Sequence, residues 1–455
     1  MWFLAALLIG AVPFAGEADA VAIGPAGANL ESCELNGVPL EGVVGPSGEF
    51  WVTRDADAWQ ALDMRADLEA PIRLPDDGGT ARLQCPGGES SLSWNRTVFG
   101  EIVRPSPGPR VEKVGESHLP PLSFVADESW LFVWPDGRAV WETVLTDVQD
   151  RVAIHMYDLR QAWVVDALLS TNASKRAALV DHAIGLEPVE LQQRAWALDS
   201  LAASGFDVVE PGSSRYRYHH LKVLVADDWV VVQSENASPN GMPERGDGNR
   251  GWGGAFHSPA MADWFWDWMQ TDRDAWDSTA WEPVGALPAQ PLPRCCARPT
   301  PEPLHLDEPI LVRPLVSPDH TLGFIWDEVA NSTRIWTQQL QIGSWESNRQ
   351  GWSQPDRFAA LLGPDAKVHV SPHADWPGKP VAGLHNKAIL MDDAVWFGSM
   401  NGNHASRAEN REVSVWLTDP HAVSYFESAF LADEQDAQVP MLLVVAFVAT
   451  LVRRF

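Results

Sequence analysis

The stretch that decides the fold occurs twice in this chain. Residues 220–228 read His-Leu-Lys-Val-Leu-Val-Ala-Asp-Asp, and residues 385–393 read His-Asn-Lys-Ala-Ile-Leu-Met-Asp-Asp. The histidine, the lysine and the first aspartate of the two copies stand 165 positions apart, and a Ser-x-Asn sequence follows each copy at the same spacing. Chance rarely places these residue types in register twice, so the two stretches indicate an internal repeat.

The match between the two copies extends beyond the motif. Asn249-Arg250 corresponds to Asn410-Arg411 at a spacing of 161 residues. Ser258-Pro259 corresponds to Asp419-Pro420 at that same spacing, and a capping residue followed by proline is a typical start of a helix. The repeat therefore predicts the same succession of elements in both halves.

The local pattern around each motif is that of two paired strands. Alternate residues of a strand share a face, so His220 and Lys222 point the same way, as do His385 and Lys387. The aspartate pair after each strand is typical of a turn, and a second apolar run then returns the chain beside the first. This return is expected to bring four polar residues back to the histidines and lysines: Ser234, Asn236, Ser399 and Asn401.

The residue types suit the chemistry of a phosphodiester. Its cleavage needs a nucleophile, a proton donor for the leaving oxygen, and positive charge around the phosphorus. Imidazole can attack or donate a proton near neutral pH, and lysine supplies a compact charge with three donors. Two of the six lysines in the chain stand in the motifs, at positions 222 and 387, which indicates that an ammonium group matters there.

The two motifs resemble the signature of the phospholipase D superfamily, His-x-Lys-x-x-x-x-Asp followed by Gly-Ser-x-Asn, and the resemblance covers about residues 124–433. It implies an α/β fold of two repeated phospholipase D-type α/β/α sandwich units with pseudo-two-fold symmetry and one active site at their seam. By the same resemblance, His220 attacks to form a phosphohistidine, and His385 protonates the departing alcohol.

The resemblance also implies roles for the remaining residues of the site. Asp227 and Asp392 occupy the positions of aspartates that orient or tune a histidine, and Glu412 fits a supporting glutamate. No cofactor is implied, and no zinc or calcium pattern is present in the sequence. The phosphate-binding candidates are Lys222, Lys387, Ser234, Asn236, Ser399 and Asn401.

The first copy departs from the family pattern at two positions. Gln233 stands where the second copy has Gly398, and its side chain is expected to narrow the pocket. Gly251 stands where the second copy has Glu412. These differences predict an asymmetric site and keep a catalytically retired site as an alternative.

The rest of the chain divides at two proline-rich stretches, near 105–121 and 283–314. Before the first stretch, residues 21–117 are rich in Gly and Pro with short apolar runs, which predicts a small β-rich domain, similar to a lamin-tail sandwich. Repeats are expected over 118–290 and 291–437. In the first repeat, apolar and amphipathic runs predict strands at 152–154 and 206–209 and helices at 161–170 and 189–204.

Both ends of the chain resemble targeting or membrane segments. An apolar run followed by Ala18-Asp19-Ala20 predicts a signal peptide over residues 1–20. Residues 439–452 are uncharged and mostly aliphatic and precede two arginines, which predicts a C-terminal membrane anchor or sorting segment over 438–455. The protein is therefore expected to be exported, in the extracellular space or at the cell surface.

Two global features narrow the function. Cys33 and Cys85 flank one N-terminal segment and could close a disulfide in an oxidising compartment. The formal net charge of −28 repels polyanions, which argues against extended nucleic-acid binding.

The expected partner is a phospholipid or another phosphodiester, and the leading interpretation is hydrolysis or transfer of phospholipid head groups. The alternatives are a secreted metal-independent nuclease, a cardiolipin-synthase-like phosphatidyl transferase, and a retired surface binding module.

Overall fold

The computed structural model contains two compact units. The first comprises Met1–His118 with the short segments Pro211–Arg217 and Thr271–Thr279, and the second comprises the rest of the chain. The structure describes residues 7–12, 19–47, 49–60, 64, 66–75, 79–94, 101–102, 112–113, 117, 119–182, 185–244, 248–288, 301–320, 332, 336–339 and 385–436.

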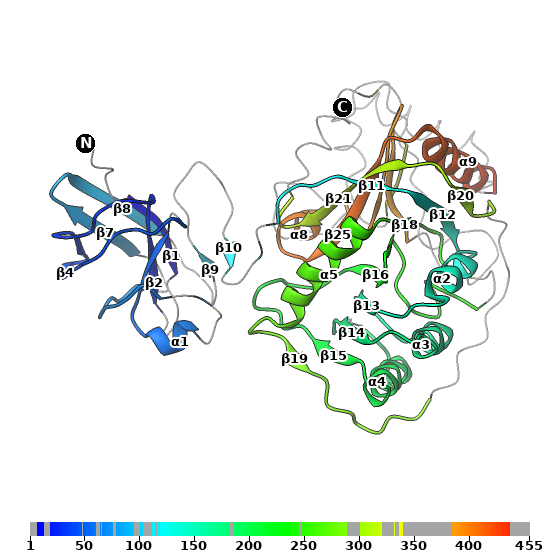
Figure 1. The fold of residues 1–455 in the computed structure, drawn as a ribbon, viewed down its shortest axis with the longest axis horizontal. Coiled ribbons are helices and arrows are strands. Elements are labelled where there is room, and N and C mark those ends of the chain that lie inside the picture. Colours follow the sequence, from blue (N-terminus) through cyan, green and yellow to red (C-terminus); the bar gives the residue numbers. More distant parts are fainter. Residues whose placement is uncertain are drawn as a thin grey trace, which may run out of the picture. The chain divides into compact units, whose positions relative to one another are not determined.

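The first unit is built mainly from two four-stranded sheets (Figure 1). One sheet has the order β1 (Leu7–Val12), β2 (Ala20–Gly24), β5 (Phe50–Thr53) and β6 (Leu68–Glu69). The other has the order β4 (Val38–Pro39), β3 (Glu34–Leu35), β7 (Gly79–Cys85) and β8 (Gly88–Trp94). Apolar side chains from both sheets form one core. The smaller elements are α1 (Ala56–Gln60), β9 (Glu101–Ile102) and β10 (Glu112–Lys113).

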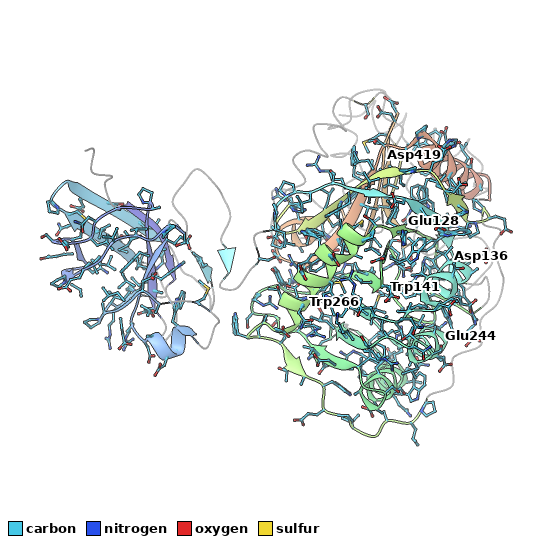
Figure 2. All side chains as sticks on the ribbon, in the orientation of Figure 1. Glu128, Asp136, Trp141, Glu244, Trp266 and Asp419 are labelled. Atoms are coloured by element: carbon cyan, nitrogen blue, oxygen red, sulfur yellow. A yellow bond between two sulfur atoms is a disulfide. The ribbon has the colours of Figure 1, made fainter. Side chains whose placement is uncertain are left out.

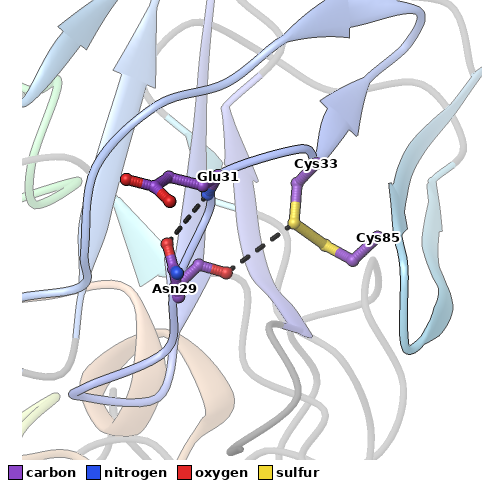
Figure 3. Close-up of a disulfide and its surroundings, with 4 residues drawn as sticks. All are labelled: Asn29, Glu31, Cys33 and Cys85. Atoms are coloured by element: carbon purple, nitrogen blue, oxygen red, sulfur yellow. Dashed lines mark hydrogen bonds between the residues drawn. A yellow bond between two sulfur atoms is a disulfide. The ribbon is translucent and has the colours of Figure 1, made fainter.

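A disulfide between Cys33 and Cys85 ties this unit together, with an S–S distance of 2.06 Å across 52 residues of sequence (Figure 3). Beside it, the backbone nitrogen of Glu31 donates to Asn29 Oδ1 at 2.9 Å. Strand β1 pairs antiparallel with β2 and lies within the segment predicted to be a signal peptide. That prediction concerns processing of the chain and stays a prediction.

The second unit is a mixed α/β structure with two large sheets. The nine-stranded sheet is parallel from β13 to β15 and antiparallel from β13 through β16, β17 and β18 to β12. Its order is β19 (Thr279–Ala280), β15 (Asp207–Glu210), β14 (Lys175–Val180), β13 (Arg151–Met156), β16 (Lys222–Ala226), β17 (Trp229–Gln233), β18 (Gly251–His257), β12 (Glu128–Trp134) and β20 (Leu304–Leu306).

The six-stranded sheet is antiparallel throughout. Its order is β11 (Phe124–Ala126), β21 (Ile310–Ser317), β25 (Glu412–Leu417), β24 (Val395–Gly398), β23 (Lys387–Leu390) and β22 (Trp336–Gln339). The two motif copies thus lie in different sheets of the same unit, each on a strand pair followed by a third strand: β16, β17 and β18 in one, and β23, β24 and β25 in the other.

Two apolar cores hold the second unit together. Helices α2 (Arg138–Leu145), α3 (Ala162–Leu169) and α4 (Pro188–Ala203) pack on one face of the nine-stranded sheet. Its other face shares a core with the six-stranded sheet and with helices α5 (Pro259–Arg273) and α9 (Pro420–Asp436). Because both faces are covered, β16 is buried along its whole length, as its apolar run requires.

Several sequence predictions are confirmed at the level of single elements. The helices expected at 161–170 and 189–204 are α3 and α4, and the expected strands are β13 and β15. Helices α5 and α9 begin at the two prolines that the repeat matched. Asp419, labelled in Figure 2, caps α9, since its Oδ1 accepts hydrogen bonds at 2.9 Å from the backbone nitrogens of His421 and Ala422.

Other predictions fall on residues that the structure does not describe. These are most of the interval between the second proline-rich stretch and His385, and the whole segment 438–455 expected to be an anchor. Among the described residues, no helix is long and apolar enough to cross a bilayer.

Candidate active site

The two motif histidines stand at the starts of matched strands. His220 precedes β16 and His385 precedes β23, so Lys222 and Lys387 are the first residues of those strands. Both lysines are fully buried, whereas the histidine side chains keep 14% and 17% of their surface exposed. Each lysine Nζ donates to the carbonyl oxygen of its own histidine, at 2.8 Å in the first copy and 2.5 Å in the second. The ammonium groups are therefore buried, whereas part of each imidazole is open to solvent and to a substrate.

Backbone hydrogen bonds bring the two copies into one site. The nitrogen of Arg411 donates to the carbonyl oxygen of Tyr218 at 2.8 Å, next to a parallel bridge between His219 and Arg411. The nitrogen of His385 donates to the carbonyl oxygen of Arg250 at 3.0 Å. Arg250 and Arg411 are the arginines that matched at the spacing of 161, so each half holds the motif strand of the other.

A buried glutamate meets the first histidine from the opposite half. Glu412 Oε2, on β25, lies 2.8 Å from His220 Nδ1. Its other carboxylate oxygen accepts a hydrogen bond from Asn410 Nδ2 at 2.9 Å. Burial alone would raise the pKa of Glu412, but the neighbouring His220, Lys222 and Ser406 outweigh it and lower the pKa. Glu412 is thus an anion at the buried edge of the imidazole.

The second histidine has a glutamate as well, and the sequence analysis missed it. Glu235 Oε2 lies 3.2 Å from His385 Nδ1 and accepts a hydrogen bond from Asn249 Nδ2 at 3.0 Å. Glu235 is fully buried in the turn that follows β17. It stands inside the motif, between the serine and the asparagine, and the only sequence signal was an acidic residue where the second copy has Met400.

These contacts fix the chemical state of the imidazoles. A carboxylate at Nδ1 favours the tautomer with the proton on that nitrogen and leaves the lone pair of Nε2 for the substrate. Burial, Lys222 and Lys387 lower the pKa of His220 to about 4, against the opposing effect of Glu412. Burial and both lysines also lower the pKa of His385, against the opposing effect of Glu235. Both imidazoles are therefore neutral near pH 7 in the free protein.

The lysines are perturbed for the same reasons. Burial lowers the pKa of Lys222 to about 7, and Lys387 adds to this shift through charge repulsion. Burial lowers the pKa of Lys387 to about 8, while Glu235 and Glu412 oppose the shift. The aromatic ring of Tyr157 packs 4.8 Å from the His220 ring, and Lys222 Nζ lies 5.3 Å from its centroid. The site thus holds two ammonium groups that an anionic substrate would stabilise.

The four motif residues Ser234, Asn236, Ser399 and Asn401 divide into two kinds. Ser234 Oγ accepts a hydrogen bond from Trp252 N at 3.0 Å, and Ser399 Oγ accepts one from Val413 N at 2.9 Å, so the serines tie neighbouring strands together. By contrast, the Oδ1 atoms of Asn236 and Asn401 are buried and have no hydrogen-bond partner within the described part of the chain. The asparagines are the better phosphate-binding candidates, because the serine hydroxyls are occupied between strands.

The motif aspartates lie at the ends of their strands opposite the lysines. Asp227 follows β16 at the end opposite Lys222, roughly 16 Å along a five-residue strand. Its carboxylate accepts hydrogen bonds at 2.9 Å from three consecutive backbone nitrogens, those of residues 149, 150 and 151. The expectation that Asp227 orients a histidine is wrong, because this carboxylate closes a turn. Asp392 lies in the matched turn between β23 and β24, at the end of β23 opposite Lys387.

Gln233 has a structural role in place of the expected position in the pocket. Its side chain is fully buried, and its Oε1 accepts hydrogen bonds from Trp134 Nε1 at 3.1 Å and Trp141 Nε1 at 2.9 Å. Trp141 lies on α2 and is labelled in Figure 2. The amide nitrogen of Gln233 donates to the carbonyl oxygen of Glu235 at 2.8 Å. Gln233 therefore braces the turn that carries the second glutamate.

The fold and the site define a class: a two-histidine centre in which each imidazole is backed by a buried carboxylate and a buried lysine. No group of three or more His, Cys, Asp or Glu side chains arranged to hold a metal ion occurs in the described ranges.

The chain resembles the phospholipase D superfamily. No protein-family model and no curated protein matches its sequence. Solved structures similar to it include phosphatidylserine synthase from Haemophilus influenzae, with 11% identity, a TM-score of 0.47, and coverage of 69% of this chain and 88% of that one. Nuc, a phospholipase D family member from Salmonella typhimurium, has 15% identity and a TM-score of 0.27 over 36% of this chain and 99% of that one. Yeast tyrosyl-DNA phosphodiesterase has 10% identity and a TM-score of 0.35 over 60% and 85% of the two chains.

Proposed function

We propose that this protein is a phosphodiesterase of the phospholipase D type, which cleaves or transfers phosphodiesters through a phosphohistidine. One observation carries the proposal: two reachable imidazoles share one site, and each has its Nδ1 against a buried glutamate of the opposite half. This arrangement favours nucleophilic catalysis by a neutral imidazole, because the buried carboxylate stabilises the imidazolium-like charge that develops on attack.

The proposed reaction has two balanced steps. His220 Nε2 attacks the phosphorus, a P–N bond forms, and the P–O bond to the leaving alcohol breaks as that oxygen takes a proton from His385. Water or a second alcohol then loses a proton to His385 and attacks the phosphorus, the P–N bond breaks, and His220 is released. His385 must carry a proton in the first step. A bound phosphodiester offsets the two ammonium groups and so raises the pKa of His385, which then takes up this proton from solvent.

The substrate oxygens have four proposed donors. Lys222 and Lys387 supply buried positive charge, which acts strongly because water does not screen it. Asn236 and Asn401, whose buried Oδ1 atoms have no partner among the described residues, supply directional hydrogen bonds from Nδ2 in either half. Because both halves provide one lysine and one asparagine, we propose that the two motif copies are related by a pseudo-two-fold axis through the site.

The proposed substrate class is phospholipid head groups. The net charge of −28 disfavours long polyanions, whereas a single head-group phosphodiester carries little charge and meets the two lysines locally. We also propose that the protein is exported, and the Cys33–Cys85 disulfide supports this, since such bonds persist in oxidising compartments.

The test is an assay of the full chain with excess EDTA. A panel of phospholipids and a labelled single-stranded oligonucleotide would be compared at low and high salt for wild type, His220→Ala and His385→Ala. His421→Ala is the matched control, because His421 is an exposed histidine on α9. Head-group release by wild type and the control, absent in both site variants, would establish the proposal. Oligonucleotide cleavage alone would transfer the protein to the nuclease class, and no turnover with either substrate would favour a retired binding module.

A further inference from the structure

The two halves of the site take their glutamates from different strand positions. In the second half the carboxylate comes from Glu412, the first residue of β25. The matched position of the first half is Gly251, the first residue of β18. The first half instead has Glu235 in the turn after β17, where the second half has Met400.

The displaced carboxylate faces the same two kinds of partner as its counterpart. Glu412 meets His220 Nδ1 with Oε2 and Asn410 Nδ2 with Oε1, whereas Glu235 meets both His385 Nδ1, at 3.2 Å, and Asn249 Nδ2 with Oε2. Asn249 and Asn410 are themselves matched at the spacing of 161. The supporting asparagine has therefore kept its place in the repeat while the carboxylate it holds has changed position.

Gly251 is what makes room for this carboxylate. A Cβ atom at position 251 would lie 2.3 Å from Glu235 Oε1 and 2.5 Å from Ser234 Oγ, far inside van der Waals contact. Any side chain there would displace the Glu235 carboxylate from His385. In the second half the converse holds, since Met400 is a fully buried apolar side chain and position 412 carries the glutamate.

We propose that Glu235 is the positioning residue of His385, a carboxylate moved from β18 to the turn after β17 and dependent on Gly251 for its space. The proposal rests on the function proposed above, and it adds a specific pair, Glu235 with Gly251, as the first half's equivalent of Glu412. The first copy therefore has its glutamate at position 235 and not at position 251, and the glycine at 251 is not a sign of a retired site.

The first experiment does not depend on any substrate. Imidazole nitrogen signals of His385 and His220 would be followed by NMR during a pH titration of wild type, Glu235→Gln and the matched variant Glu412→Gln, with assignment by His385→Asn and His220→Asn. We expect Glu235→Gln to lower the pKa of His385 and to reduce its Nδ1–H tautomer, while His220 stays largely unchanged. Glu412→Gln should act on His220 in the same way. An unaltered His385 in folded Glu235→Gln would overturn the proposal.

The second experiment moves the carboxylate back. Glu235→Met should reduce kcat on the order of 100-fold, the loss typical when a group that orients an active histidine is removed. The double variant Glu235→Met/Gly251→Glu restores the arrangement of the second half, where Ser399 and Glu412 coexist at the matched positions. We expect the kcat of this double variant to be at least about 10-fold higher than that of Glu235→Met, with KM little changed.

Gly251→Ala completes the series. It keeps Glu235 but fills its space, so kcat should fall although no charge is lost. Activity of Gly251→Ala equal to wild type, or a double variant no better than Glu235→Met, would refute the relocation. If wild type turns over no substrate at all, the proposed function fails, while the NMR result for His385 still decides whether Glu235 positions it.

Discussion

The half of the site built on β16, β17 and β18 and the half built on β23, β24 and β25 reach the same chemistry with different sequences. Both present a histidine, a buried lysine and an asparagine whose Oδ1 has no partner among the described residues, and both have a glutamate against the histidine of the other half. They differ in where that glutamate is attached and in what replaces it at the vacated position. The contact at the imidazole is therefore retained, while its place in the chain is free to change.

The two halves also differ in which strand carries a glycine. In register across β17 and β18, Gln233 faces Gly253, whereas across β24 and β25, Gly398 faces Ser414. A Cβ at Gly398 would lie 2.4 Å from Ser414 Cα, and one at Gly253 would lie 2.4 Å from the ring of Phe132. The glycine therefore stands on β18 in the first half, where it makes room for Phe132, and on β24 in the second half, where it makes room for the backbone of Ser414.

The largest expected effect separates the two histidines. His220→Ala should lose on the order of 10⁴-fold in kcat with every substrate, because the nucleophile is gone. His385→Ala should lose as much in turnover of an alcohol leaving group, whereas the first-turnover burst of p-nitrophenol from a p-nitrophenyl phosphodiester, whose leaving group needs no proton, should be far less affected. Release of p-nitrophenol measures this difference. Equal losses in both variants with both leaving groups would mean that the two halves do not divide the nucleophile and acid roles as proposed.

The two lysines offer the next contrast. Lys222→Met and Lys387→Met should each reduce kcat about 10²- to 10³-fold, the usual loss for one donor to a developing charge. Lys222→Arg should restore the charge but fit poorly into a fully buried position, so we expect it to remain below wild type. Steady-state kinetics decide the matter, and a Met variant with normal kcat would remove that lysine from the site.

The pH dependence tests both the nucleophile and the lysines. His220 attacks only when neutral, so kcat/KM should fall as pH decreases through the pKa of about 4. His385 and the lysines act only when protonated, so kcat/KM should also fall as pH rises, first through the lowered pKa of His385 and then through the pKa values of about 7 for Lys222 and about 8 for Lys387. In Lys222→Arg the part of this alkaline limb that belongs to Lys222 should move to higher pH. An acid limb near 6.5, the ordinary histidine value, would contradict the burial of His220.

A smaller effect is expected at the asparagines that hold the glutamates. Asn249→Ala and Asn410→Ala each remove one hydrogen bond to a carboxylate and leave the carboxylate in place. We expect kcat to fall by roughly 10-fold in both, since each acts through a glutamate and a histidine. A large effect in one half and none in the other would show that only one glutamate matters.

The smallest effect on activity is expected at Asp227. Asp227→Ala should keep kcat within about 3-fold of wild type but lower the free energy of unfolding by roughly 2–3 kcal/mol, because three backbone nitrogens lose their acceptor. Thermal or urea denaturation gives the stability, and the head-group assay gives kcat. A loss of activity comparable to that of the lysine variants would return Asp227 to the catalytic group.

Much of this site follows from the sequence because the repeat compares the chain with itself. The spacing of 165 residues identifies both histidines and both lysines, and the spacing of 161 identifies the asparagine and arginine pairs. Strands and helices such as β13 and α4 follow from apolar periodicity, which local sequence carries.

The sequence could not show the residues whose roles depend on contacts across the sheets. Glu235 has no matched glutamate, so a position-by-position comparison registers only a loss at Gly251. Asp227 is part of the motif, yet its three backbone partners come from the start of β13 and the turn before it, at least 76 residues away in sequence. Only the fold brings such residues together.

The disulfide of the first unit can be reduced without changing the sequence of the chain. Cys33 and Cys85 close a loop across 52 residues, and both cysteines lie in the first unit, whereas every residue of the two-histidine centre lies in the second. By chain entropy alone, opening such a loop lowers the free energy of unfolding by about 4 kcal/mol, because the unfolded chain gains freedom. A thiol reductant should therefore loosen the first unit, so a titration of Cys295→Ser/Cys296→Ser with dithiothreitol can report whether turnover depends on that unit.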